Sequence, residues 1–70
     1  MASEIRSAGK ATEIATTFLK QYYGFLRPLS AERSNGNWVV KIDVGAILKE
    51  IAEITIDASS AEIISYKLPE

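Results

Sequence analysis

The sequence predicts an α+β two-layer sandwich in which one N-terminal helix packs on a four-stranded antiparallel meander sheet, in the order αββββ. Apolar residues recur every three or four positions in residues 10–23, which is the spacing of one helix face. Asn35-Gly36 stands between two segments of alternating character, and residues 51–57 and 62–68 form a second such pair. One helix lying across two consecutive hairpins buries all of these apolar faces together.

The helix is expected to run from Lys10 to Tyr23, which is about four turns. Gly24 stands where a residue with left-handed backbone would end the helix, and Pro28 prevents the helix from resuming. The helix is therefore expected to end at Gly24.

The start of the helix is less sharply marked. Ser3 and Ser7 are both suitable N-cap residues, whereas Gly9 weakens the first turns. We therefore expect residues 1–9 to be a flexible or partly helical lead-in and residues 10–68 to form a single domain.

The first hairpin is predicted by Asn35-Gly36, because a two-residue type I′ turn needs positive φ at both positions. This turn sets Arg33 opposite Trp38 and Leu29 opposite Ile42. Arg33 then lies either over the Trp38 ring as a cation–π pair or in solvent beside a half-buried ring.

The second hairpin allows two loop lengths. A four-residue loop pairs Asp57 with Glu62 but mixes polar and apolar residues on each face. A three-residue loop, residues 59–61, pairs Ile56 with Ile64 and separates the faces, so we prefer it. It places Ala61 in the left-handed region, at a cost of about 1 kcal/mol.

The predicted core takes the apolar face of the helix and the inward positions of the strands, and Ile47 and Leu48 are expected to close one end of it. Its members are Ile14, Ala15, Phe18, Leu19 and Tyr22 from the helix, and Leu29, Trp38, Val40, Ile42, Ile54, Ile56, Ile64 and Tyr66 from the sheet.

Composition excludes much chemistry. The 70 residues include no Cys and no His, so the commonest nucleophile, general base and transition-metal ligand are missing. Glu53, Asp57 and Glu62 lie on an open sheet face or near a turn, where carboxylates are solvated, and Asp57 can accept hydrogen bonds from loop amides. We expect no catalytic residue, no metal site and no cofactor.

Charge and hydropathy limit the classes of partner and the cellular location that we expect. The net charge of −1 disfavours a nucleic-acid partner, and no segment has the apolar length of a signal peptide or a membrane span. We expect a cytoplasmic protein, or an extracellular one if a signal peptide has been removed.

Three segments together resemble a PepSY-type domain, namely residues 11–15, 37–42 and 54–64. The family favours an aromatic-led strand, here led by Trp38, and a closing hairpin with Asp-Ala-x-Thr-Gly, here Asp57-Ala58-Ser59-Ser60-Ala61. Ser60-Ala61 departs from the usual Thr-Gly, and the chain has no secretion signal although many such domains act outside the cytoplasm. The resemblance, over residues 10–67, implies a non-catalytic module that regulates a peptidase in some members.

The leading hypothesis is a protein- or peptide-interaction module that uses its sheet. Strand 62–68 is the less guarded edge, so a peptide or a second copy is expected to add there, the latter as a weak homodimer. The expected contact surface on the outer sheet face is Val39, Lys41, Ile63, Ser65 and Lys67.

The alternative hypothesis is a ligand-binding domain at the end of the helix, near Ile47. Aromatic and basic residues there could stack on a ligand ring or, in a third hypothesis, on a nucleic-acid base. The competing structural role is packing under the turn from helix to strand. The residues of this cluster are Lys20, Tyr23, Phe25 and Arg27. The nucleic-acid hypothesis uses the cations Lys20, Arg27, Arg33 and Lys41, and the net charge disfavours it.

Overall fold

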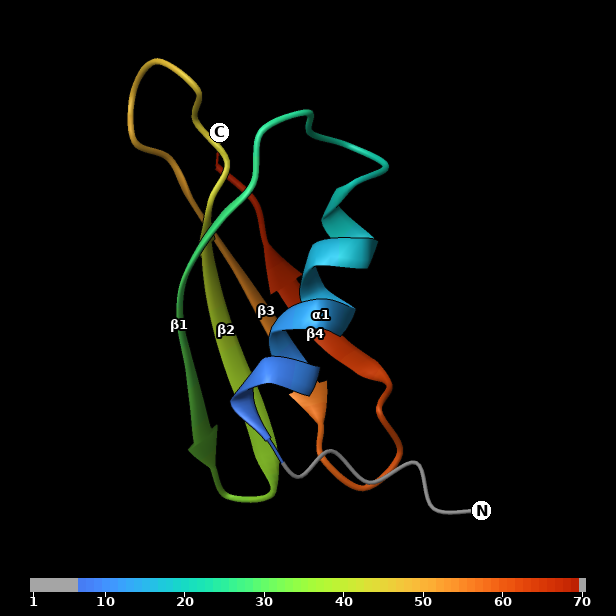
Figure 1. The fold of residues 1–70 in the computed structure, drawn as a ribbon. Coiled ribbons are helices and arrows are strands. Elements are labelled where there is room, and N and C mark those ends of the chain that lie inside the picture. Colours follow the sequence, from blue (N-terminus) through green and yellow to red (C-terminus); the bar gives the residue numbers. More distant parts are fainter. Residues whose placement is uncertain (1–6, 70) are drawn as a thin grey trace.

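The fold is known from a computed structural model that describes residues 7–69. Its elements are α1 (Ala8–Leu19), β1 (Arg27–Ser34), β2 (Asn37–Asp43), β3 (Ile51–Asp57) and β4 (Ile63–Lys67). The strands form one antiparallel sheet in the order β1-β2-β3-β4, and α1 lies across one face of it (Figure 1). The predicted αββββ sandwich is confirmed.

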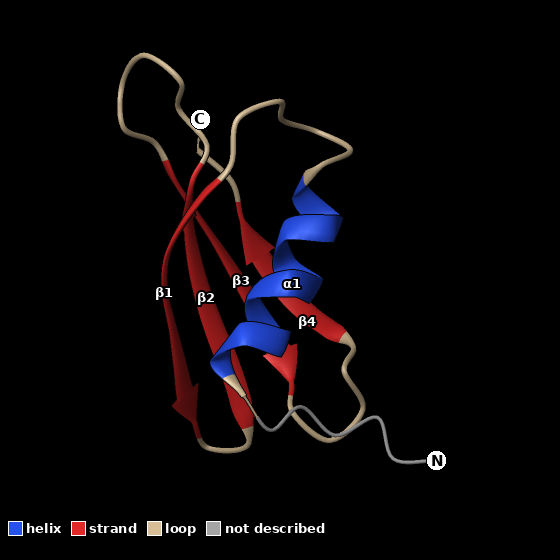
Figure 2. Cartoon of the chain, viewed as in Figure 1, coloured by secondary structure: helices blue, strands red, loops and turns tan. Residues whose placement is uncertain are grey.

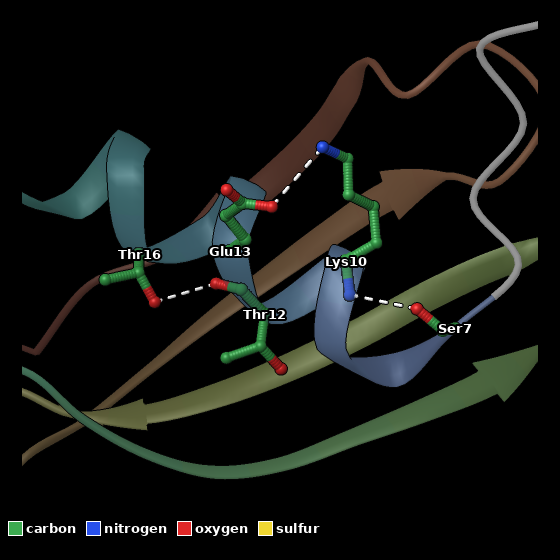
Figure 3. A network of polar contacts seen from close by, with 5 residues as sticks. All are labelled: Ser7, Lys10, Thr12, Glu13 and Thr16. Atoms are coloured by element: carbon green, nitrogen blue, oxygen red, sulfur yellow. Dashed lines mark hydrogen bonds and ion pairs between the residues drawn. The ribbon is translucent and has the colours of Figure 1, made fainter.

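Helix α1 begins two residues before the expected position, because Ser7 is its N-cap. The Ser7 Oγ accepts a hydrogen bond from the Lys10 amide at 3.1 Å, which satisfies one of the free N–H groups of the first turn (Figure 3). Lys10 and Glu13 form an exposed ion pair one turn apart, at 3.3 Å. Ser3, the other proposed cap, lies outside the described residues.

The helix ends at Leu19, so the predicted end at Gly24 is wrong. The amides of Tyr22 and Tyr23 both donate to the Leu19 carbonyl, at 2.9 and 3.0 Å, so a tight turn satisfies it before Gly24 is reached. Gly24 does not have positive φ. Because the last expected turn is absent, Tyr22 leaves the core face and is 54% exposed.

The first hairpin has the predicted turn. Asn35 and Gly36 have φ values of 49° and 82°, and Arg33 pairs with Trp38. The pairing shifts by one residue at Leu29, so that Pro28 and not Leu29 faces Ile42. This bulge leaves Leu29 42% exposed and corrects its assignment to the core.

The second hairpin combines the two loops that the sequence allowed. Next to the turn, the Asp57 amide donates to the Glu62 carbonyl at 2.8 Å and Ile56 pairs with Ile63, which is the four-residue register. A bulge then shifts the pairing by one residue, so that Thr55 pairs with Ser65 as predicted. The predicted pairing of Ile56 with Ile64 is therefore wrong. Ala61 has the expected positive φ, at 66°.

The core lies between α1 and the inner face of β2 and β3. Ile14 and Phe18 are part-buried against it. Ile64 and Tyr66, predicted as core, are 54% and 50% exposed because they lie on the outermost strand, beyond most of the helix. The buried apolar residues are Ala11, Ala15, Leu19, Trp38, Val40, Ile42, Val44, Ala52, Ile54, Ile56 and Ala58.

The connections lie at opposite ends of the sheet. The turns at 35–36 and 58–61 lie at one end, where the Ala58 amide donates to the Gly36 carbonyl at 2.9 Å. The connection from α1 to β1 and the loop from β2 to β3 lie at the other end, and Figure 2 shows both as long tan segments. We call this second end the loop end.

Candidate functional site

The outer sheet face carries four of the five predicted contact residues. Val39 pairs with Thr55, which pairs with Ser65, so these side chains form one row across the sheet. A second row consists of Lys41, Glu53 and Lys67, and the Lys67 Nζ lies 4.0 Å from a Glu53 carboxylate oxygen. The rows are polar apart from the part-buried Val39. This face is a solvated surface with little apolar area to bury.

Ile63 does not belong to that surface. It pairs with Ile56, which faces the core, and it packs against the core as a part-buried residue. Its assignment to the outer face is therefore corrected. The physical reason is the bulge, which places both Ile63 and Ile64 opposite Ile56 and reverses the expected alternation at Ile63.

The inner side of β4 has a more apolar surface. The Phe18 ring contacts both Tyr66, with ring centroids 5.1 Å apart, and Tyr22, at 5.6 Å. Ile64 lies two positions before Tyr66, which places it on the same side of the strand. Three of these residues are about half-exposed (Ile64 54%, Tyr66 50%, Tyr22 54%). We call Phe18, Tyr22, Ile64 and Tyr66 the α1–β4 flank.

The flank exists because α1 lies toward the other side of the sheet. The helix packs against β1, β2 and β3 and reaches β4 through the Phe18 ring. Strand β4 is also an edge strand, since β3 pairs with it on one side only. The half-exposed apolar side chains of the flank therefore lie directly beside an edge of the sheet.

The four residues of the predicted ligand cluster have separate environments. Lys20 is exposed at the end of α1, Tyr23 is part-buried against the core, and Phe25 is 38% exposed. The Arg27 guanidinium donates a hydrogen bond to Asp43 at 3.1 Å. Tyr23 therefore has the packing role, and Arg27 serves the fold of the neighbouring loop.

Asp43, the last residue of β2, is 2% exposed and organises the loop end. Its Oδ1 accepts hydrogen bonds from the amides of Gly45 and Glu50, at 3.0 and 3.1 Å, and its Oδ2 accepts from Arg27. These two amides, with the guanidinium, hold the pKa of Asp43 below its ordinary value. The carboxylate stays ionised while joining both ends of the loop. We call these contacts the Asp43 brace.

The loop that the brace closes runs over residues 44–50. The Val44 amide donates to the Glu50 carbonyl at 2.8 Å, which ties the two ends together directly. A Cβ on Gly45 would lie 1.7 Å from the Leu48 carbonyl oxygen, so only glycine fits this folded path. The loop lines a shallow, open hollow with Val44, Gly45, Ala46, Ile47, Leu48 and Glu50.

Ile47 and Leu48 do not close the core, as was expected, but project into solvent. Ile47 is 95% exposed and Leu48 is 74% exposed. The reason is the brace, because its contacts turn the loop back on its own backbone and leave these side chains outside. We call Ile47 and Leu48 the apolar tip.

At the turns, one contact is as predicted and another decides between two alternatives. The Asp57 carboxylate accepts hydrogen bonds from the amide and the hydroxyl of Ser59, at 2.9 and 3.0 Å, and these contacts lower its pKa. The Arg33 guanidinium carbon lies 5.8 Å from the centre of the Trp38 ring, which is the cation–π alternative. Both are contacts within the fold.

Two further findings concern metal-ligating side chains and the length of the helix. Residues 7–69 contain no group of three or more metal-ligating side chains of the types His, Cys, Asp or Glu. Over the same residues, no helix is both long and apolar enough to cross a membrane. The α1–β4 flank and the apolar tip, with their exposed apolar side chains, are the candidate surfaces for a partner.

Sequence reasoning predicted the edge at strand 62–68, but it missed the exposed apolar side chains of the flank and of the tip. The Asp43 brace, which leaves the tip exposed, did have a sequence signal. In Asp43-Val44-Gly45 an Asp stands two residues before a glycine, which is typical of a turn closed by the Asp side chain. No sequence signal marks the flank, since it depends on how far α1 reaches across the sheet.

Comparison of the chain with protein-family models, with curated proteins and with solved structures found no match.

Proposed function

We propose that this domain is a non-catalytic interaction module that binds an extended segment of a partner protein along β4. The observation that carries the proposal is the α1–β4 flank, in which half-exposed Ile64 and Tyr66 lie beside the edge of the sheet. A segment added to an edge gains main-chain hydrogen bonds from the strand, and its alternate side chains reach one face. Here that face is apolar.

The bulge limits the length of the bound segment. Regular pairing of β4 covers residues 65–67, so an added strand has a short ladder to join. Affinity therefore depends on apolar side chains of the partner that pack on Phe18 and Tyr66. A segment with two large apolar residues separated by one position matches this spacing.

The resemblance to PepSY domains favours a peptidase, or its propeptide, as the source of the segment. A regulator of this kind needs to hold a strand of its target without cleaving it. The absence of Cys and His from the sequence is compatible with that task.

Selection of displayed peptides on the immobilised domain tests the proposal. We expect short peptides with alternating apolar residues, whose affinity falls at least about tenfold on Ile64→Lys or Tyr66→Ser, because the apolar contact is lost. Lys41→Ser, on the outer face, is the matched control and should leave affinity unchanged. Circular dichroism checks that each variant is folded.

Methylation of the peptide backbone tests the binding mode. In an added strand, alternate amides bond to the edge, so N-methylation should abolish binding at every second residue and be tolerated between them. Selected peptides that bind the Ile64→Lys and Tyr66→Ser variants as tightly as the native domain would contradict the proposal. So would a methylation profile without alternation.

A further inference from the structure

The apolar tip lies on a loop whose two ends are fixed by hydrogen bonds. Ile47 and Leu48 bury little of their surface, so they contribute little to the core. The loop that presents them nevertheless has a nearly inaccessible carboxylate, Asp43, bonded to amides at both of its ends. A loop with a fixed path and exposed apolar side chains is suited to contact with a binding partner.

Other exposed apolar side chains lie at the same end of the molecule as the tip. Arg27, the first residue of β1, pairs with Asp43, the last of β2, so the connection before β1 and the loop after β2 leave the sheet at the same end. That connection carries Tyr22 and Phe25, which are 54% and 38% exposed. The two segments that carry these exposed apolar residues thus lie at one end of the molecule (Figure 1).

The charges of the described residues are distributed unevenly between the two ends. The loop end has the cations Lys20 and Lys49 and the exposed carboxylate Glu50, while Arg27 and Asp43 neutralise each other as an ion pair in the brace. The turns at the opposite end have the carboxylates Glu32, Asp57 and Glu62 and the cation Arg33. The start of α1, with its Lys10–Glu13 ion pair, lies at this end as well (Figure 1). The apolar end therefore has the more positive net charge of the two ends.

We propose that the loop end docks on an anionic lipid surface, with Ile47 and Leu48 entering the interface. Insertion of a few apolar side chains combined with nearby cations is how peripheral proteins hold such a surface. Half-exposed aromatic residues such as Tyr22 and Phe25 suit the level of the lipid headgroups.

Shape favours a lipid surface over a pocket in a partner protein. A pocket would receive one projecting loop, whereas here the exposed apolar residues lie on two segments. The molecule is elongated, with extents of 39 × 20 × 18 Å, and Figure 2 shows both segments at one end of the long dimension. A flat, deformable surface accepts such an end without a matched cavity.

Co-sedimentation with lipid vesicles tests this proposal. We expect the native domain to bind phosphatidylcholine vesicles that contain about one third phosphatidylserine, and to bind pure phosphatidylcholine vesicles more weakly. The double variant Ile47→Ser, Leu48→Ser should weaken binding at least about tenfold. Its melting temperature should stay unchanged because both side chains are exposed in the native fold.

Because the chain has no Cys, a single introduced thiol can report which end docks. Ala46→Cys lies beside the tip, and Ser59→Cys, also at an exposed position, lies at the opposite end. An environment-sensitive dye should brighten and shift to the blue on the anionic vesicles when attached at position 46 and stay unchanged at position 59.

Failure of the native domain to sediment with anionic vesicles at millimolar lipid would overturn the proposal and direct attention to a protein pocket as the partner of the tip. Equal binding by the double Ser variant, or an equal dye response at positions 46 and 59, would overturn it as well. Peptide binding at β4 does not depend on any of these outcomes.

Discussion

Ala61 is a position at which the native residue destabilises the fold, and Ala61→Gly should raise the melting temperature. Its φ of 66° lies in the left-handed region, which costs an L residue about 1–2 kcal/mol and costs glycine almost nothing. Glycine loses about 0.4–1 kcal/mol more chain entropy on folding than alanine. Part of a methyl contact is also lost, because Ala61 packs against the core.

These effects leave a net stabilisation of about 0.5 kcal/mol, or roughly 2–4 °C in a domain of this size. Thermal unfolding followed by circular dichroism measures the shift, and urea unfolding at one temperature measures the free energy directly. Ala58→Gly is the matched control in the same turn. Ala58 is 2% exposed and does not have positive φ, so its change to glycine should lower the melting temperature.

A melting temperature that stays level or falls in Ala61→Gly would refute the reasoning. It would mean that position 61 does not adopt left-handed backbone in the folded chain, and the four-residue turn with its following bulge would then be wrong as well. A parallel rise in Ala58→Gly would show that the turn gains from flexibility in general and not from relief at one residue.

The remaining predictions concern the loop end and the core. Gly45→Ala should lower the free energy of unfolding by more than about 1 kcal/mol, since its Cβ would meet the Leu48 carbonyl, whereas Gly9→Ala, in open space on α1, should raise it by about 0.5–1 kcal/mol in the same urea titration. Asp43→Asn should destabilise the domain at neutral pH. Because folding lowers the pKa of Asp43, its contribution is present above the unfolded pKa, near 3.8, and is lost as the pH falls through the folded pKa, so the difference in urea midpoint should shrink in acid. Leu19→Ala, at 0% exposure, should cost about 2–5 kcal/mol and leave little folded protein at 37 °C by circular dichroism.

The features that local sequence determines were predictable. Asn35-Gly36 specifies its turn because two adjacent positive φ values suit few other residue pairs. Separating apolar from polar residues on the two faces of the hairpin placed Ala61 in the left-handed region. Ala61 does have positive φ, although the turn has four residues and not three. Periodicity likewise identified Ala15 and Leu19 as core residues.

The features that depend on tertiary packing were not predictable. Ile47 and Leu48 have the composition of core residues, and their exposure follows only from the contacts of a buried Asp43. Tyr66 has the alternation of an inward strand residue, yet its burial depends on whether the helix reaches the last strand. Periodicity assigns a side chain to a face, but it does not report whether another layer covers that face.

The two bulges bear on what the sheet edges can do. Both edge strands contain one, at Leu29 in β1 and at Ile64 in β4, and β1 also carries Pro28 near its start. Bulges and prolines interrupt the ladder that a second sheet would need, so they oppose open-ended association of the domain. On β4 the interruption lies at the first residues and leaves positions 65–67 regular. An edge of that length accommodates a short segment better than a whole strand of a second copy, which is why the proposed partner is a peptide and not another domain of this kind.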